Sequence, residues 1–124
     1  MGIGGTEIVI TRYAEGGVIG QGLAVMKGTA ANQVKLPTGA GVRATGVTML
    51  GAAAAGEAIP IVVAGPTQAI AGGAINPDDF VKVGGTNGRL VATTNANDEV
   101  VGRALSSAGT NGDEFSLLVQ AHKY

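Results

Sequence analysis

The sequence predicts an all-β domain, a sandwich or small barrel built from two tandem repeats. The first observation is that a shift of 56 positions places turn glycines and alternating apolar residues on one another without a gap. The second is composition: the 124 residues include 22 glycines, and 45% are hydrophobic, with Ala and Val dominating. The third is the recurrence of strand signals about every 8 to 12 residues, which is typical of a sandwich or barrel.

Turn glycines carry much of the repeat. Gly16–Ile19 fall on Gly72–Ile75, and Gly56 with Glu57 falls on Gly112 with Asp113. These positions matter because glycine is the default residue where the backbone must turn sharply. The apolar alternation is repeated as well, with Ile59, Ile61 and Val63 falling on Phe115, Leu117 and Val119.

The repeat indicates one domain over residues 14–124, with copies over about 14–65 and 70–121. Because each copy is too small to bury its own apolar face, we predict that the two close on each other around a pseudo-two-fold axis. Residues 1–13 lie outside the repeat and are predicted to form an extended N-terminal arm.

The first copy contains short extended segments that glycine and proline separate. Pro37 ends one segment, since proline cannot donate to a β-ladder, and Pro60 favours a strand edge or a strand start. Ala52–Ala55 is expected to be a loop or a single short turn. The predicted strands are Val18–Lys27, Asn32–Leu36, Val42–Leu50 and Ile59–Ala64.

The second copy follows the same order. Asn87-Gly88 is the strongest hairpin signal in the chain and predicts a type I′ turn. Glu99–Leu105 corresponds to the Val42–Leu50 segment of the first copy. The predicted strands are Ala69–Ile75, Phe80–Val83, Arg89–Thr94, Glu99–Leu105 and Glu114–Ala121.

Charge and aromatic content argue against several classes of partner. The formal net charge is -1 and the basic residues are scattered, whereas nucleic-acid binders carry a basic stripe. Aromatic residues make up 3% and Trp is absent, so stacking platforms for bases or sugars are lacking. No apolar run reaches the roughly 18 residues that span a bilayer. We therefore expect no nucleic-acid and no membrane partner. Met1–Gly5 do not resemble a secretory signal, so we expect synthesis in the cytoplasm.

No group of residues suggests catalysis or a metal centre. Cysteine is absent, and the single histidine, His122, has no neighbouring ligand cluster. The acidic pairs Asp78-Asp79, Asp98-Glu99 and Asp113-Glu114 could hold Ca²⁺ or exchange protons, but each lies beside Pro, Asn or Gly and is expected to serve a turn. The sequence therefore predicts no enzyme, no catalytic residue, no metal and no cofactor.

The segment Thr6–Tyr13 alternates as a β-strand and is apolar on both faces. One interpretation makes Glu7–Arg12 the first strand of the barrel. The other makes the segment a strand offered to the sheet edge of another protein, with Tyr13 as its anchor. On this second interpretation, deletion of residues 1–13 is expected to leave a folded protein that no longer binds its partner.

Two stretches carry a resemblance to a known family. The first is Gly46–Leu50 followed by an Ala-rich loop and Gly56–Gly65, and the second is Val101–Leu105 followed by a loop and Gly112–Val119. In this succession the chain resembles the capsid cement, or head decoration, proteins of tailed bacteriophages, over about Tyr13–Gln120.

The resemblance implies a compact β-barrel or β-tulip-like fold and a homotrimeric, non-enzymatic virion protein. It would bind the outer surface of the expanded phage head and stabilise the capsid by cross-linking subunits of the major capsid protein. Alternatives that stay open are another structural β-module, such as a tail fibre, pilus or surface-layer component, and a module that binds a small ligand. The residues expected to contact the capsid are Thr6, Glu7, Ile8, Val9, Ile10, Thr11, Arg12 and Tyr13.

Overall fold

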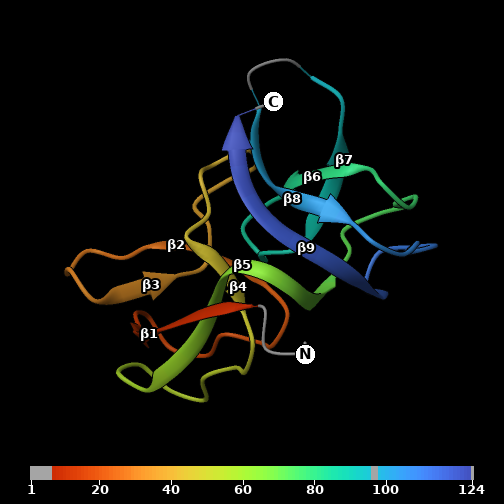
Figure 1. The fold of residues 1–124 in the computed structure, drawn as a ribbon. Coiled ribbons are helices and arrows are strands. Elements are labelled where there is room, and N and C mark those ends of the chain that lie inside the picture. The colour runs from red at the N-terminus through yellow and green to blue at the C-terminus, as the bar shows by residue number, and fades with distance from the viewer. Residues whose placement is uncertain (1–6, 96–97, 124) are drawn as a thin grey trace.

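A computed structural model describes residues 7–95 and 98–123, with side chains described as far as Gln120. These residues form strands, turns and loops without a helix, so the predicted all-β class is confirmed (Figure 1). None of the described residues belongs to a helix that could cross a membrane. The strands are β1 Ile8–Ala14, β2 Ala24–Lys27, β3 Gln33–Lys35, β4 Gly46–Thr48, β5 Ala58–Ile70, β6 Phe80–Val83, β7 Leu90–Thr93, β8 Glu99–Ala104 and β9 Glu114–Lys123.

The first half of the chain forms a closed barrel of five strands. The strands follow the order β1-β3-β2-β4-β5, and β5 pairs back to β1. Only the β1–β3 pair is parallel. The interior is filled by the buried side chains of Ala14, Ile19, Val25, Val34, Ala52, Ile59 and Ile61.

The second half repeats these pairings. The β2–β4 pair Val25↔Gly46 returns in β6–β8 as Val81↔Gly102. The strands now follow the order β5-β9-β8-β6-β7. A parallel bridge between Ala71 and Leu90 links the end of β5 to β7, as β1 is linked to β3. The strand pairing thus follows the 56-residue repeat.

One strand departs from the 56-residue spacing. The amide of Ala14 donates to Glu57 O (2.9 Å), and the amide of Ala71 donates to Asp113 O (2.8 Å). Glu57 and Asp113 are 56 residues apart, but Ala14 and Ala71 are 57 apart. The last part of β5 therefore corresponds to β1 with one extra residue, and residue 15 corresponds to residue 72.

Each half buries its own interior, which differs from the prediction that the halves close on each other. The seven interior residues of the first barrel have buried equivalents in the second. A narrow barrel is filled by a few side chains, so each half can bury an interior of its own. Residues of the first half that face outward, Ala24, Val47 and Val62, join that second cluster and hold the two barrels together. The equivalent interior residues are Ala71, Ile75, Val81, Leu90, Ala108, Phe115 and Leu117.

β5 runs unbroken across the predicted boundary between the copies. Two separate strands were expected, Ile59–Ala64 and Ala69–Ile75. Instead, Gly65 adopts a positive φ of 103° and the strand continues. The first part of β5 pairs with β1 and β4 and the second part with β9, so both barrels share it (Figure 1).

Two strands of the first copy are shorter than predicted. Within Val18–Lys27 only β2 is a regular strand, while Ile19 forms an isolated bridge with Ala52. Within Val42–Leu50 only Gly46–Thr48 pair as a strand. The glycines in these segments allow turns that separate the bridging residues from the strands.

The hairpin expected at Asn87-Gly88 is present, but its turn type is not the predicted one. β6 and β7 pair antiparallel, and the amide of Gly84 donates to Arg89 O (2.9 Å). A type I′ turn needs positive φ at both central residues, whereas only Gly88 has it, at 78°. The Asn87 side chain instead accepts the Arg89 amide (3.1 Å), a local hydrogen bond that Asn commonly makes in turns.

β1 lies within the first barrel, which corrects the predicted boundary of the N-terminal arm at residue 13. Ile8–Tyr13 pair antiparallel with residues 58–64, and Ala14 is buried in the interior. This matches the interpretation in which Glu7–Arg12 is the first barrel strand. Residues 1–6 lie outside the described residues. Deletion of residues 1–13 would remove one of five barrel strands, so the truncated protein is expected to lose this barrel rather than to stay folded.

Candidate functional site

The residues expected to bind the capsid lie along one side of the first barrel. Thr6 is outside the described residues, Glu7 lies in the bend before β1, and Ile8–Tyr13 are in the strand. One edge of β1 is paired with β5. Because β3 begins at Gln33, opposite Tyr13, the other edge of β1 is paired only at its end.

In the described part of the chain, this leaves an open backbone edge along residues 8–12. The amide of Tyr13 points toward β3 and donates to Asn32 O (2.8 Å). Amides alternate in direction along a strand, so those of Thr11 and Val9 point to the same side. The amides of Thr11 and Val9 therefore face away from β5. On that side β3 reaches only as far as Tyr13, and no other described strand pairs with β1 there. Such an edge can accept a strand from another protein.

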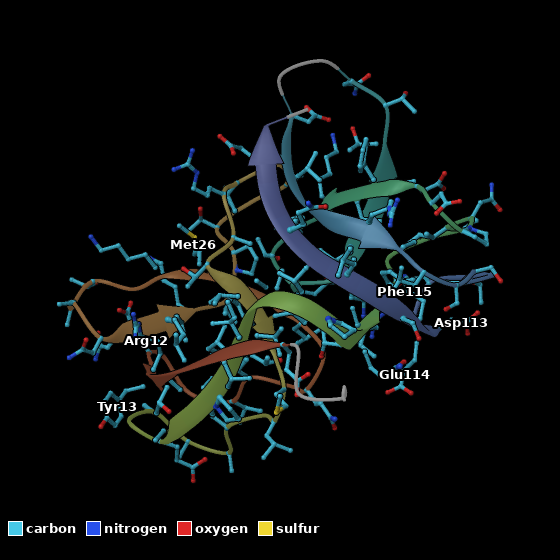
Figure 2. All side chains as sticks on the ribbon, in the orientation of Figure 1. Arg12, Tyr13, Met26, Asp113, Glu114 and Phe115 are labelled. Carbon is cyan, nitrogen blue, oxygen red and sulfur yellow. The ribbon has the colours of Figure 1, made fainter. Side chains whose placement is uncertain are left out.

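Apolar side chains flank this open edge. Ile8 is 58% exposed, Val9 40% and Tyr13 45%, while Ile10 packs against the interior of the first barrel. A register shift between Ile8 and Val9 leaves both side chains outside the barrel. Figure 2 shows Tyr13 at the far end of β1, directed away from the barrel.

Arg12 adds one positive charge to the predicted segment. Its Nη1 donates to the carbonyl of Thr11 (2.9 Å), and no carboxylate of the described residues forms an ion pair with it. The segment therefore combines an open backbone edge, exposed apolar side chains and a guanidinium group. Such a combination suits contact with another protein.

The equivalent edge of the second barrel is blocked. Pro66 occupies the position that Val9 holds in β1, and proline has no N–H to offer. The amide of Ile70, equivalent to that of Tyr13, donates to Gly22 O (2.9 Å). A Cβ on Gly22 would lie 3.3 Å from Gln68 O, so the Gly22 turn packs closely against this edge.

Two of the three acidic pairs serve turns, as predicted. Asp79 Oδ2 accepts the amide of Asn76 (2.9 Å), and Asp113 Oδ2 accepts the amides of Gly109 and Thr110 (3.1 Å each). Among the described residues, no three His, Cys, Asp or Glu side chains gather as metal ligands do. His122, in β9, pairs with Val100 of β8, and the His122 side chain lies outside the described part.

Asp98 has a different role from the other acidic pairs. Its Oδ2 accepts hydrogen bonds from the Thr93 hydroxyl and from Lys82 Nζ (3.0 Å). These two hydrogen bonds, that of Thr93 first, hold the pKa of Asp98 below its ordinary value, because they stabilise the charged carboxylate. Asp98 thus joins β6 and β7 to the start of β8.

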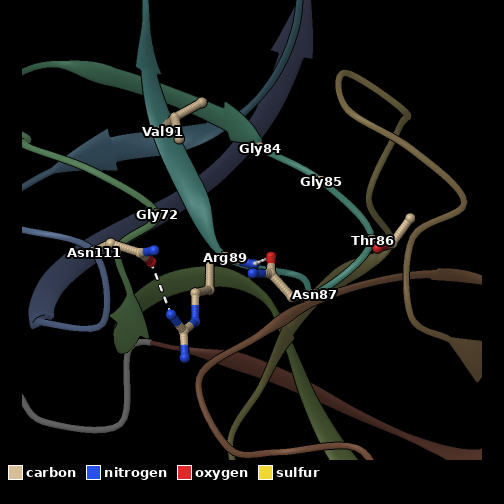
Figure 3. A pocket seen from close by; sticks show the side chains of 8 residues that line it. All are labelled: Gly72, Gly84, Gly85, Thr86, Asn87, Arg89, Val91 and Asn111. Atoms are coloured by element: carbon tan, nitrogen blue, oxygen red, sulfur yellow. Dashed lines mark hydrogen bonds between the residues drawn. The ribbon is translucent and has the colours of Figure 1, made fainter.

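Sequence reasoning missed a glycine-lined pocket beside the β6–β7 loop. Its volume is about 280 Å³, and Arg89 lies on its wall (Figure 3). A signal was available in the repeat, because Arg89 stands where the first copy has the neutral Gln33. The pocket is lined by Gly72, Gly84, Gly85, Thr86, Asn87, Arg89, Val91 and Asn111.

No family model matches the chain. No curated protein matches it either. Among solved structures, the chain is similar to the head fiber gp8.5 N base of bacteriophage phi29, with a TM-score of 0.72 and 17% sequence identity. The match covers 96% of this chain and 98% of that chain. The chain therefore shares, over nearly its whole length, the fold of the phi29 head fiber base.

Proposed function

We propose that the protein is a structural component of a bacteriophage head. The observation that carries this proposal is the similarity of fold, over 96% of the chain, to a head fiber base. The resemblance of Gly46–Gly65 and Val101–Val119 to capsid cement proteins supports the same location. In the virion the protein would lie on the outer surface of the capsid, with the major capsid protein as its partner.

The open edge of β1 is the proposed capsid contact. A strand of the capsid protein would pair with the backbone at Val9 and Thr11, and Ile8 and Tyr13 would cover the junction with apolar surface. Each added hydrogen bond contributes only about 1 kcal/mol net. A single edge of this length therefore binds weakly.

Trimerisation would convert this weak contact into stable attachment. Three edges on one homotrimer bind together, and effective concentration raises avidity by a factor on the order of 10²–10⁴. Each trimer would then cross-link several capsid subunits. The capsid is stabilised by mass action, because the protein binds the assembled shell and not its separated subunits.

The same contact serves a second candidate function, the base of a head fibre. The phi29 structure favours this candidate, since that chain is itself described as a head fiber base. A cement protein and a fibre base both attach to the capsid surface. They differ in whether a further fibre segment projects from the attached domain.

Co-sedimentation with expanded empty capsids tests the proposal. The wild-type protein is expected to sediment with capsids at a fixed ratio to the major capsid protein, and alone as a trimer. Val9→Pro removes an N–H from the open edge, and Pro66 at the equivalent position shows that a strand of this fold accepts proline. Val9→Thr is the control, because it also replaces the valine side chain but keeps the N–H.

The outcomes separate the proposals. Loss of capsid binding by Val9→Pro, with binding retained by Val9→Thr, supports attachment through the β1 edge. Equal binding of both variants would remove the edge from the proposal and leave the capsid as partner. Failure of the wild-type protein to bind capsids of its own phage would overturn the proposed function.

A further inference from the structure

The first barrel holds a carboxylate of its own in the loop between β2 and β3. Glu15 Oε1 accepts the amide of Thr29 (2.6 Å), and Glu15 Oε2 accepts the Thr29 hydroxyl (3.3 Å). A Cβ on Gly28 would lie 2.7 Å from Glu15 Oε1, so the carboxylate packs directly against the glycine. This loop is therefore shaped around a carboxylate group.

Backbone hydrogen bonds identify the equivalent residues in the second barrel. The amide of Glu15 donates to Val34 O (2.8 Å), and the amide of Gly72 donates to Leu90 O (2.6 Å). In the loops themselves, Gly28 donates to the carbonyl of Gln33 (2.7 Å), as Gly84 donates to that of Arg89 (2.9 Å). Glu15 thus corresponds to Gly72, Thr29 to Gly85 and Gln33 to Arg89.

The Glu15 carboxylate has no equivalent in the second barrel, and Val91 Cγ1 borders its place, 3.1 Å from where a Cβ on Gly72 would lie. Gly72 has no side chain, so it supplies no acceptor to the amide of Gly85. A Cβ added to Gly85 would meet no heavy atom within 4 Å. This space is the pocket of about 280 Å³ in Figure 3, where Gly72 and Gly85 both line the wall.

The charge of the pocket also differs between the barrels. Gln33 of the first barrel is neutral, and its Oε1 accepts the amide of Ala30 (3.2 Å). At its place in the second barrel, Arg89 Nη1 donates to Asn111 Oδ1 (2.8 Å), a neutral partner. No carboxylate of the described residues forms an ion pair with Arg89. The second barrel has thus exchanged a built-in carboxylate for a cation.

We infer that this pocket binds a carboxylate from another molecule, in the position that Glu15 occupies in the first barrel. The amide of Gly85 and the guanidinium of Arg89 would donate to its oxygens, and hydrogen bonds in which the acceptor is an ionised carboxylate are stronger than those between neutral groups. The Glu15 site favours an acidic side chain of a partner protein as the source. The inference does not depend on the proposed capsid attachment.

An NMR titration with sodium acetate tests the chemistry of the pocket. In the full ¹⁵N-labelled chain, the amides of Gly85 and Thr86 and the Nε–H of Arg89 are expected to shift and saturate. Sodium chloride at equal ionic strength should leave them unchanged. Arg89→Gln, which copies the first barrel, should weaken the response about tenfold, an effect of about 1.4 kcal/mol. Arg43→Gln is the matched control, since Arg43 is exposed and pairs with Glu99 elsewhere.

Two peptides distinguish the sources of the carboxylate. An acetylated and amidated Gly-Glu-Gly peptide should shift the same amides, and the matching Gly-Gln-Gly peptide should not. A response to acetate but not to the Glu peptide would support the carboxylate site and assign it to a small free acid. Equal shifts with acetate and chloride, or an undiminished response in Arg89→Gln, would overturn the inference.

Filling the pocket from within the chain provides a second measurement. Gly72→Glu recreates the arrangement of Glu15 and should abolish the acetate response. A Cβ at residue 72 would lie 3.1 Å from Val91 Cγ1, so Gly72→Gln is the control that carries the same crowding without the charge. The Glu variant should melt at a higher temperature than the Gln variant. Equal melting temperatures together with a retained acetate response would contradict the inference.

Discussion

The two barrels have the same strand pairing but different surfaces. Val9 gives the first barrel an open backbone edge, whereas Pro66 blocks that edge in the second. Glu15 fills the loop pocket of the first barrel, whereas Gly72 leaves it empty in the second. The repeat thus preserves the residues that build the barrels and varies those that we propose to contact other molecules. We therefore propose different binding sites on the two barrels, the β1 edge on the first and the Arg89 pocket on the second.

The largest expected effect is the loss of the first barrel on deletion of residues 1–13. The deletion removes the strand that closes the barrel and exposes Ile59 and Ile61, buried side chains of the neighbouring strand β5. Burial of one such side chain stabilises a protein by about 1.5–3 kcal/mol. Hydrogen exchange should show β2, β3 and β4 unprotected. Full protection of these strands in the truncated protein would show that β1 is a separable arm after all.

Equivalent glycines provide the next test of the comparison. A Cβ would lie 2.4 Å from Val62 O at Gly46, and 2.1 Å from Leu118 O at Gly102. We expect Gly46→Ala and Gly102→Ala each to lower the free energy of unfolding by about 1–3 kcal/mol, as overpacking does. Urea denaturation measures this, with Gly73→Ala as the control, because its Cβ would meet nothing within 4 Å. A neutral effect at either site would mean that the barrels are packed differently.

A smaller effect of opposite sign is expected at a turn where the copies differ. Gly22 and Asp78 are equivalent and both have positive φ, 75° and 70°. Such a conformation strains residues that carry a Cβ. Relief of this strain, about 1–2 kcal/mol, outweighs the extra chain entropy that glycine loses on folding, about 0.5–1 kcal/mol. Asp78→Gly should therefore stabilise the protein by the difference, about 0.5–1 kcal/mol, measured by urea denaturation. Asp78→Ala keeps the strain, so an equal gain in that control would refute the explanation.

The smallest expected effect depends on pH and concerns the second barrel. Lys82, Thr93 and Asp98 stand where the first barrel has Met26, Pro37 and Val42. Because the pKa of Asp98 is lowered in the folded state, its stabilising effect is present above the ordinary aspartate pKa of about 3.9. The effect is lost as the pH falls through the lowered folded-state value.

Thermal melting at a series of pH values checks this expectation. Asp98→Asn should melt below the wild type at pH 7, and the gap should close as the solution becomes more acidic than about pH 3.9. Met26→Leu, which changes the apolar counterpart, should show a gap that does not vary with pH. A gap between the wild type and Asp98→Asn that persists in strong acid would contradict the assigned charge.

Much of the fold follows from local signals in the sequence. The span Phe80–Val83 was predicted with its observed ends, since clear turn residues bound it on both sides. The unbroken β5 was not predictable in this way. Gly65 allows many backbone conformations, and Pro66 has no N–H to donate, but neither property determines whether a strand ends or bends. Whether β1 closes the barrel was left open between two interpretations, because the register between β1 and β5 joins residues about 50 positions apart.

The candidate sites show the same limit. β1 was found from its alternation and its place outside the repeat. Its open edge depends on where β3 begins, a fact of tertiary pairing that no local pattern contains. The Arg89 pocket became visible only when the hydrogen bonds of Glu15 and Gly72 established which residues are equivalent. The one-residue change of spacing hides that equivalence in the linear repeat.

The most direct test of the central proposal, that the β1 edge binds the capsid, is to compare amide hydrogen exchange of the free protein and of the capsid-bound protein. The peptide covering residues 7–13 would be followed in the free protein and in the capsid-bound protein. The peptide covering residues 65–71, its equivalent in the second barrel, is the internal control. We predict slower exchange at Val9 and Thr11 on binding, with residues 65–71 unchanged. Unchanged exchange in residues 7–13 of fully bound protein would contradict attachment through β1.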